Sequence, residues 1–176
     1  MIKIEKYFDL KRINLDFHKE LNRVGEDVVK DHIDRLNGGQ GVDGRQLKSL
    51  TPSTIHAKKH KGSPNPRTPL VDTGMMKKIY VNKKATRTDQ ETTIIPAKKR
   101  AKIGAIHQEG TKPYSIHVKK AKALGALFNS RGDMYFSKSV DHPGHPKREW
   151  FGLTKKIEAK ADRLMQLALE RKLRNA

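Results

Sequence analysis

Residues 10–36 read LKRINLDFHKELNRVGEDVVKDHIDRL, and this stretch is the main determinant of the predicted fold. Its apolar residues recur mostly three or four positions apart, so one side of an α-helix would be apolar and the rest charged. These residues are Leu10, Ile13, Phe17, Leu21, Val24, Val28 and Leu36. Asn37-Gly38-Gly39 follows, and the helix is predicted to end there because Asn and Gly tolerate the left-handed conformation common after a helix.

A second amphipathic helix is predicted over residues 154–173. Thr154 suits the N-cap position, since its hydroxyl can accept a backbone N–H of the first turn. The apolar stripe of this helix consists of Ile157, Ala161, Leu164, Ala168 and Leu169. From Glu170 to Ala176 the chain is polar, so we expect the helix to fray there.

Residues 38–69 are rich in Gly and Pro and contain the basic run Lys58-Lys59-His60-Lys61. Neither helix nor sheet tolerates such a mixture well, so we expect a long extended arm. One short helical turn is predicted at Thr51-Pro52, because Thr suits the cap and Pro the first helical position. A stretch of this length without structure is uncommon unless it is functional, disordered or held by another subunit.

Residues 70–141 form the predicted β region. Asp72-Thr73-Gly74 is expected to cap a short helix over 75–80. Strands are predicted at Val81 and over 91–96, 102–107 and 114–118, and a hairpin joins 124–128 to 134–140 through the turn at 129–133. Residues 142–153 then form a Pro/Gly turn followed by the aromatic anchor Trp150-Phe151. We therefore predict one α+β domain over 1–176, with an antiparallel sheet covered by two helices.

The charge balance points to a partner. Lys and Arg number 38 against 19 Asp and Glu, a net charge of +19, and only 35% of the residues are hydrophobic. A self-repelling chain of this kind usually meets a polyanion or an acidic surface. Free nucleic acid, DNA threading a protein channel and an acidic neighbouring protein all satisfy the charge, and composition does not rank them.

Two basic clusters near the predicted sheet are candidate contacts for DNA or for an acidic partner. They consist of Lys98, Lys99, Arg100 and Lys102, and of Lys119, Lys120 and Lys122. Each is either a solvated face or a phosphate contact. The chain has no Cys, no apolar leader within Met1–Arg12 and no apolar run near ~18 residues, so we expect neither secretion nor a membrane span.

Catalytic and metal-binding interpretations are weaker. His142 and His145 could act as metal ligands, but Pro143-Gly144 between them more simply makes a turn. His107 could serve as a general base, yet no nucleophile lies near it in the sequence. Arg131-Gly132-Asp133 has the composition of a hairpin turn. We therefore predict no enzyme activity, no catalytic residue, no metal and no cofactor.

One block of the sequence runs from Gly44-Arg45 through Leu50-Thr51-Pro52-Ser53-Thr54, and a second is Pro69-Leu70-Val71-Asp72-Thr73-Gly74-Met75-Met76. These blocks resemble the phage virion morphogenesis family, which includes Mu-like tail-completion proteins. Ala105-Ile106-His107-Gln108-Glu109-Gly110 resembles the family's His-Gln-x-Gly block, and His142-Pro143-Gly144-His145-Pro146 with Trp150-Phe151-Gly152-Leu153 its turn before the last helix. The predicted hairpin within 114–140 also resembles neck and tail-terminator proteins of long-tailed phages.

The resemblance implies a structural subunit of a ring, expected to be a hexamer, that joins the tail tube to the head connector. It implies a virion protein assembled in the bacterial cytoplasm, with DNA in the channel as a further possible partner. A sequence-independent nucleic-acid-binding protein is the alternative. The residues expected to contact neighbouring subunits or partners are those of the blocks. They are Leu50, Thr51, Pro52, Thr54, Leu70, Asp72, Thr73, Gly74, His107, Gln108, Gly110, Trp150 and Phe151.

Overall fold

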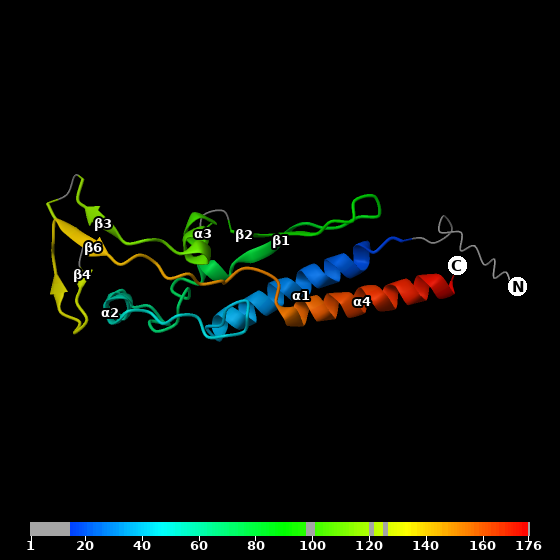
Figure 1. Cartoon of the computed structure of the whole chain (residues 1–176), viewed down its shortest axis with the longest axis horizontal. Helices are drawn as coiled ribbons and strands as arrows, with labels where there is room; N and C mark the ends of the chain where they lie inside the picture. Colours follow the sequence, from blue (N-terminus) through cyan, green and yellow to red (C-terminus); the bar gives the residue numbers. More distant parts are fainter. Residues whose placement is uncertain (1–14, 98–100, 120–121, 125–126, 176) are drawn as a thin grey trace, which may run out of the picture.

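The computed structural model describes residues 15–97, 101–119, 122–124 and 127–175. The molecule is elongated: two long helices lie side by side at one end, and two of the three strand pairs occupy the other, while the third lies along the first long helix (Figure 1). The helices are α1 (His18–Asn37) and α4 (Lys155–Arg174). Between them in the sequence lie α2 (Pro52–His60), the 3-10 turn η2 (Met75–Lys77) and α3 (Ala101–Glu109). The strands are β1 (Ile79–Lys83), β2 (Thr93–Pro96), β3 (Tyr114–His117), β4 (Leu127–Phe128), β5 (Met134–Tyr135) and β6 (Ser139–His142).

The fold class is α+β, as the sequence predicted, and both long helices are present. Within the described residues the strands do not join into one sheet; they form three antiparallel pairs, β1 with β2, β3 with β6 and β4 with β5. The predicted hairpin is confirmed, because Asn129 Oδ1 accepts the backbone N–H groups of Arg131, Gly132 and Asp133 at 2.9–3.0 Å. The predicted strand over 134–140 is divided: β5 returns to β4, whereas β6 pairs with β3.

The N-terminal helix begins later than predicted. Residues 15–17 are not helical, and Leu10 and Ile13 lie outside the described residues. Asp16 turns back on the chain, since its carboxylate accepts the N–H of His18 at 3.1 Å and contacts His18 Nδ1 at 2.6 Å. Asp forms such local bonds at the expense of the helix. The backbone and side-chain bonds from His18 also hold the pKa of Asp16 below its usual value.

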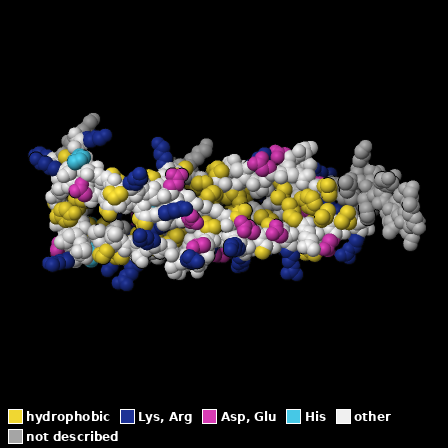
Figure 2. Space-filling view, viewed as in Figure 1, with side chains coloured by type: hydrophobic (Ala, Val, Ile, Leu, Met, Phe, Trp, Pro, Cys, Tyr) yellow, Lys and Arg dark blue, Asp and Glu magenta, His cyan; other side chains and the backbone are white. Residues whose placement is uncertain are grey.

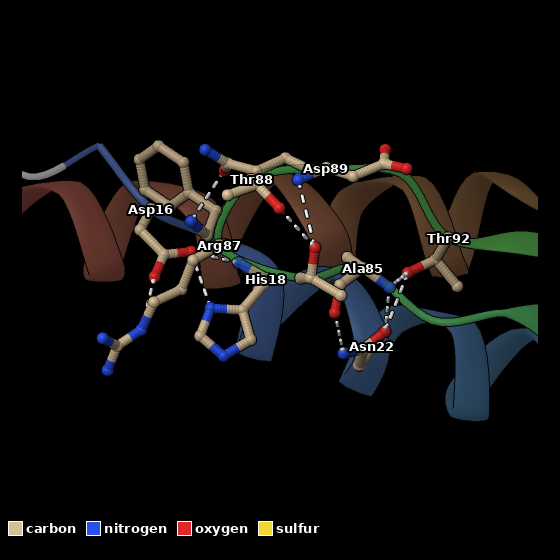
Figure 3. A network of polar contacts seen from close by, with 11 residues as sticks. Asp16, His18, Asn22, Ala85, Arg87, Thr88, Asp89 and Thr92 are labelled. Carbon is tan, nitrogen blue, oxygen red and sulfur yellow. Dashed lines mark hydrogen bonds and ion pairs between the residues drawn. The ribbon is translucent and has the colours of Figure 1, made fainter.

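The loop between β1 and β2 is fastened to the first turns of α1 (Figure 3). Asn22 exchanges two hydrogen bonds with the backbone of Ala85, one to the carbonyl at 3.0 Å and one from the N–H at 2.8 Å. Thr92 Oγ1 also donates to Asn22 Oδ1 at 3.0 Å. A Cβ on Gly25, one turn further along, would lie 2.7 Å from Thr92 Cγ2, so glycine permits this close approach. The β1–β2 pair therefore packs on α1.

The segment expected to be an extended arm is largely folded onto its own chain. Helix α2 runs nine residues where a single turn was predicted, and Thr51 caps it by accepting the N–H of Thr54. Leu47 is buried in the core, and the N–H of Val42 donates to the carbonyl of Glu149 at 2.8 Å. The arm prediction failed because these anchors are residues remote in sequence.

Three further boundaries differ from the predictions. The expected short helix over 75–80 is the three-residue turn η2, after which Ile79 already belongs to β1. The expected strand over 102–107 is helix α3. Helix α4 continues through Arg174 instead of fraying from Glu170, helped by basic residues in its last turn, which favour the negative end of a helix. Its N-cap is as predicted, with Thr154 Oγ1 accepting the N–H of Ile157 at 3.3 Å.

The core lies in the middle of the long axis, where the elements from both ends meet. It consists of Leu36, Leu47, Val71, Met76, Ile79 and Trp150. Half-buried Val29, Leu70, Ile94 and Phe151 pack against it. The core is small for a chain of 176 residues, so long segments at both ends extend beyond it.

Candidate assembly surfaces

The sequence blocks that are far apart in the chain meet around Trp150. This side chain is 3% exposed, and its Nε1–H donates to the carbonyl of Gly104 at 2.9 Å. A Cβ on Gly104 would lie only 2.5 Å from Trp150 Cζ2, so α3 approaches the indole as closely as it does because residue 104 has no side chain. Trp150 is thus an anchor of the protomer's own core.

Gln108 joins α3 to the segment that follows Trp150. Its Oε1 accepts the N–H groups of Trp150 and Phe151 at 3.1 and 3.2 Å, and its Nε2 donates to the carbonyl of Phe151 at 3.1 Å. Gly110, at φ +77°, ends the helix, and a Cβ there would lie 2.8 Å from the carbonyl of His145. The His-Gln-x-Gly block is therefore a clamp between α3 and residues 145–151.

Arg148 connects this clamp to the segment before α2. Its guanidinium is buried and donates from Nε to the carbonyl of Lys48 at 3.0 Å and from Nη2 to that of Ser49 at 3.3 Å. Its backbone N–H donates to the carbonyl of His107 at 2.7 Å. Burial lowers the pKa of Arg148 from its ordinary value, but arginine keeps its charge in proteins. A fixed cation therefore lies inside the junction.

Four rings line up beside Arg148. His142 stacks on Tyr114 with centroids 4.9 Å apart, His145 lies 4.7 Å from His142, and His107 lies 5.5 Å from His145. Burial, the Arg148 charge and His145 together lower the pKa of His107 to about 4. Burial and then His142 and Arg148 lower the pKa of His145 as well. Among the described residues no group of three or more His, Asp or Glu is arranged to hold a metal ion.

The His32 side chain joins α1 to η2 and to the aromatic residues Trp150 and Phe151. Its ring is almost fully buried, 5.4 Å from that of Trp150 and 6.1 Å from that of Phe151. Nε2 donates to the carbonyl of Met76 at 3.1 Å and so ties α1 to η2. Burial lowers the pKa of His32 below its usual value.

Lys58 organises the loop that follows α2. Its ammonium donates to the carbonyls of Asn65, Thr68 and Val71 at 2.8, 2.9 and 2.9 Å, so all three N–H groups are used.

Leu70 has φ +62°, the only positive φ of a non-glycine residue in the part of the chain that the structure describes. Such a conformation is strained for Leu, and packing against the core maintains it.

The predicted contact residues therefore divide into two groups. Trp150, Gln108, Gly110 and the backbone of His107 hold the protomer together, and Phe151 and Leu70 pack against its core. Gly74, at φ +72°, starts η2, and Leu50 is half-buried. The exposed members, available to a partner, are Thr51, Pro52, Thr54, Asp72 and Thr73. Contact of any of them with another chain stays a prediction.

The predicted basic clusters are exposed where they are described. Lys102 lies on α3, and Lys119 and Lys122 lie between β3 and β4. The predictions on Lys98, Lys99, Arg100 and Lys120 fall outside the described residues.

The structure exposes two apolar surfaces that were not predicted from the sequence. The first, here called the tip, consists of Met134, Tyr135 and Phe136 beyond the hairpin turn, and Phe136 is 64% exposed. The second, here called the α4 face, consists of exposed Leu167 and half-buried Leu164 one turn before it; Leu169 and Leu173 are also exposed but lie on another side of this helix. Figure 2 shows hydrophobic atoms at the end of the molecule that carries the sheets and again along the helical end. The available signals were Leu167, an apolar residue outside the predicted stripe of residues 154–173, and the three consecutive apolar residues 134–136.

The described part of the chain exposes apolar side chains at both ends, and exposed apolar patches are common where proteins interact. The comparison with protein families identifies the family of the chain. The model of the phage virion morphogenesis family matches residues 6–170, and the chain belongs to this family, which acts in phage structure and assembly. Membership associates the chain with the virion. None of the curated proteins and none of the solved structures matches it. No helix in the described part of the chain has the length and hydrophobicity to cross a bilayer.

Proposed function

We propose that the chain is a non-enzymatic subunit of a ring, most simply a hexamer, that joins the phage tail tube to the head connector at the neck or the completed tail end. Family membership supports a part in virion assembly. The observation that carries the ring is the presence of two different apolar surfaces, the tip and the α4 face, at opposite ends of one elongated protomer.

Rings need contacts of this kind. In a cyclic assembly each copy presents one surface to the preceding copy and a different surface to the next. Exposed aromatic and aliphatic side chains such as Phe136 and Leu167 supply the buried centre that stable interfaces require. A protomer with a small core and apolar ends completes its burial against neighbours. The tip of one copy would then dock on the α4 face of the next.

Paired variants test this arrangement. Phe136→Asp removes the tip and Leu167→Asp the α4 face, and each alone should convert rings into monomers in native mass spectrometry and electron microscopy. Leu153→Asp is the matched control, because Leu153 is as exposed as Leu167 but lies before Thr154, the N-cap of α4, and about 18 Å of helix separates that cap from Leu167. Its rings should persist.

Mixing the two variants gives a sharper result. In an equimolar mixture the Phe136→Asp chain keeps an intact α4 face and the Leu167→Asp chain keeps an intact tip. The two chains should therefore form heterodimers through this one contact, although no ring can close. The proposed contact would be contradicted if the mixture contained only monomers, or if either variant by itself formed rings. A monomeric wild-type chain at high concentration would overturn the ring itself.

A further inference from the structure

The positive charge of the chain is concentrated in two segments that contain no acidic residue. Residues 44–71 carry six Lys or Arg and no Asp or Glu, and residues 110–132 carry five and none. Together these 51 residues hold +11 of the net +19, which leaves +8 for the other 125 residues. A separation of charge on this scale creates a strong local field.

The structure brings parts of the two segments to the same end of the molecule. Helix α2 packs against β4, with the rings of His60 and Phe128 5.2 Å apart. A Cβ on Gly132 would lie 2.7 Å from the ring of His56, so the hairpin turn also touches α2. Figure 1 places α2 and the β3–β6 and β4–β5 pairs together at the end away from the long helices. We call this the cationic end.

The charges of the cationic end are not neutralised within the chain. Six exposed members have no described carboxylate within ion-pairing distance. They are Lys59, Lys61, Arg67, Lys119, Lys122 and Arg131. Some cations nearer the helical end are paired: Lys160 lies 2.7 Å from Asp27, and Lys83 lies 2.7 Å from Asp89. A bound polyanion would offset the mutual repulsion of these cations.

We propose that the cationic end binds the phosphate backbone of nucleic acid without regard to sequence. The composition favours phosphate over a protein partner, because eight of the eleven cations in the two segments are Lys. Protein interfaces are depleted in Lys and enriched in Arg, whereas Lys serves well as a point charge for phosphate. This property does not depend on ring formation, although a ring would multiply it.

The experiment compares three variants that each remove three positive charges. The first carries Lys59→Gln, Lys61→Gln and Arg67→Gln on the α2 side. The second carries Lys119→Gln, Lys122→Gln and Arg131→Gln on the sheet side. The matched control carries Lys155→Gln, Lys156→Gln and Arg163→Gln, three exposed cations of α4. Binding to a short duplex and to a single-stranded oligonucleotide is followed by fluorescence anisotropy over a series of salt concentrations.

Wild-type affinity should fall steeply with salt, and each cationic-end variant should lower the slope of log K against log salt by about 2 to 3, near 0.9 per lost duplex phosphate contact. The control should change it by less than about 1. Equal loss in the control would overturn the assignment, as would the absence of wild-type binding to either oligonucleotide. Polyglutamate is added as a competitor at the same total negative charge as the DNA. If it displaces the DNA, an acidic protein would be identified as the partner instead. The mass of the assembly, measured on the same samples, separates failure of this inference from failure of the ring.

Discussion

Replacing Gln108 with Leu tests whether the clamp between α3 and residues 145–151 holds the protomer together. The amide makes three hydrogen bonds, two accepted from the N–H groups of Trp150 and Phe151 and one donated to the carbonyl of Phe151. Leucine is close in size to glutamine and fits the helix, so the change removes the bonds while leaving the backbone of α3 free to form.

The expected loss follows from the number of bonds. A hydrogen bond contributes about 1 kcal/mol net, so three give about 3 kcal/mol, with a range of about 1.5 to 4.5. The backbone groups left behind are partly buried, which places the loss in the upper part of that range. For a chain of this size 1 kcal/mol corresponds to about 2–4 °C, so the midpoint of thermal unfolding should fall by about 6–12 °C.

Calorimetry and urea unfolding of the assembled and dissociated protein would measure the change. Gln166→Leu is the matched control, because Gln166 is also helical but exposed, and within the described residues its side chain bonds to the Glu170 side chain alone, at 3.2 Å. It should alter stability by less than about 0.5 kcal/mol. If Gln108→Leu unfolded at the same midpoint as the control, the clamp would have no energetic weight and the assigned role of the His-Gln-x-Gly block would be wrong.

Three further predictions concern stability. Gly104→Ala should cost about 1–3 kcal/mol in calorimetry despite the better helix propensity of alanine, because its Cβ would overlap the indole of Trp150, whereas Gly38→Ala, with no contact nearer than 3.5 Å, should be neutral. Lys58→Met should lower stability by at least about 3 kcal/mol, since three backbone carbonyls lose the hydrogen bonds that the ammonium group donates. The same variant should expose residues 61–71 to protease, and an unchanged cleavage rate would contradict this prediction. Lowering the pH from 6.5 to about 4 should destabilise the fold, because His107 stays neutral when folded but takes up a proton when unfolded. The His107→Gln variant should show a weaker dependence of its unfolding free energy on pH in urea titrations. An identical slope in the variant and the wild type would refute this prediction.

Local sequence signals correctly identified the elements that depend on local physics. The stripe and the Asn-Gly-Gly stop located α1, and Thr154 located the first turn of α4. The hairpin around residues 129–133 followed from turn chemistry, because the Asn129 side chain alone bonds three backbone N–H groups. Each of these features is decided by residues within about one or two turns of one another.

Helix α3 was predicted as a strand for an identifiable reason. Ile103, Ala105 and His107 alternate with other residues, which is the pattern of a half-buried strand. In the structure the side of α3 that meets the core carries Gly104 and Gln108, four residues apart, and Ile103 is exposed. A helix that contacts the core through a glycine and an amide has no apolar stripe by which the sequence could reveal it.

The sequence by itself determined the two long helices, the hairpin, the α+β class and an excess of positive charge that calls for a partner, because periodicity, caps and composition are properties of neighbouring residues. Tertiary structure decided that Lys58, Gln108 and Arg148 bind backbone groups of their own chain, and that two acid-free segments share one end of the molecule. Those outcomes depend on which residues, far apart in sequence, come within hydrogen-bonding or Coulombic range. Such proximity is created by folding and leaves no periodic trace in the sequence.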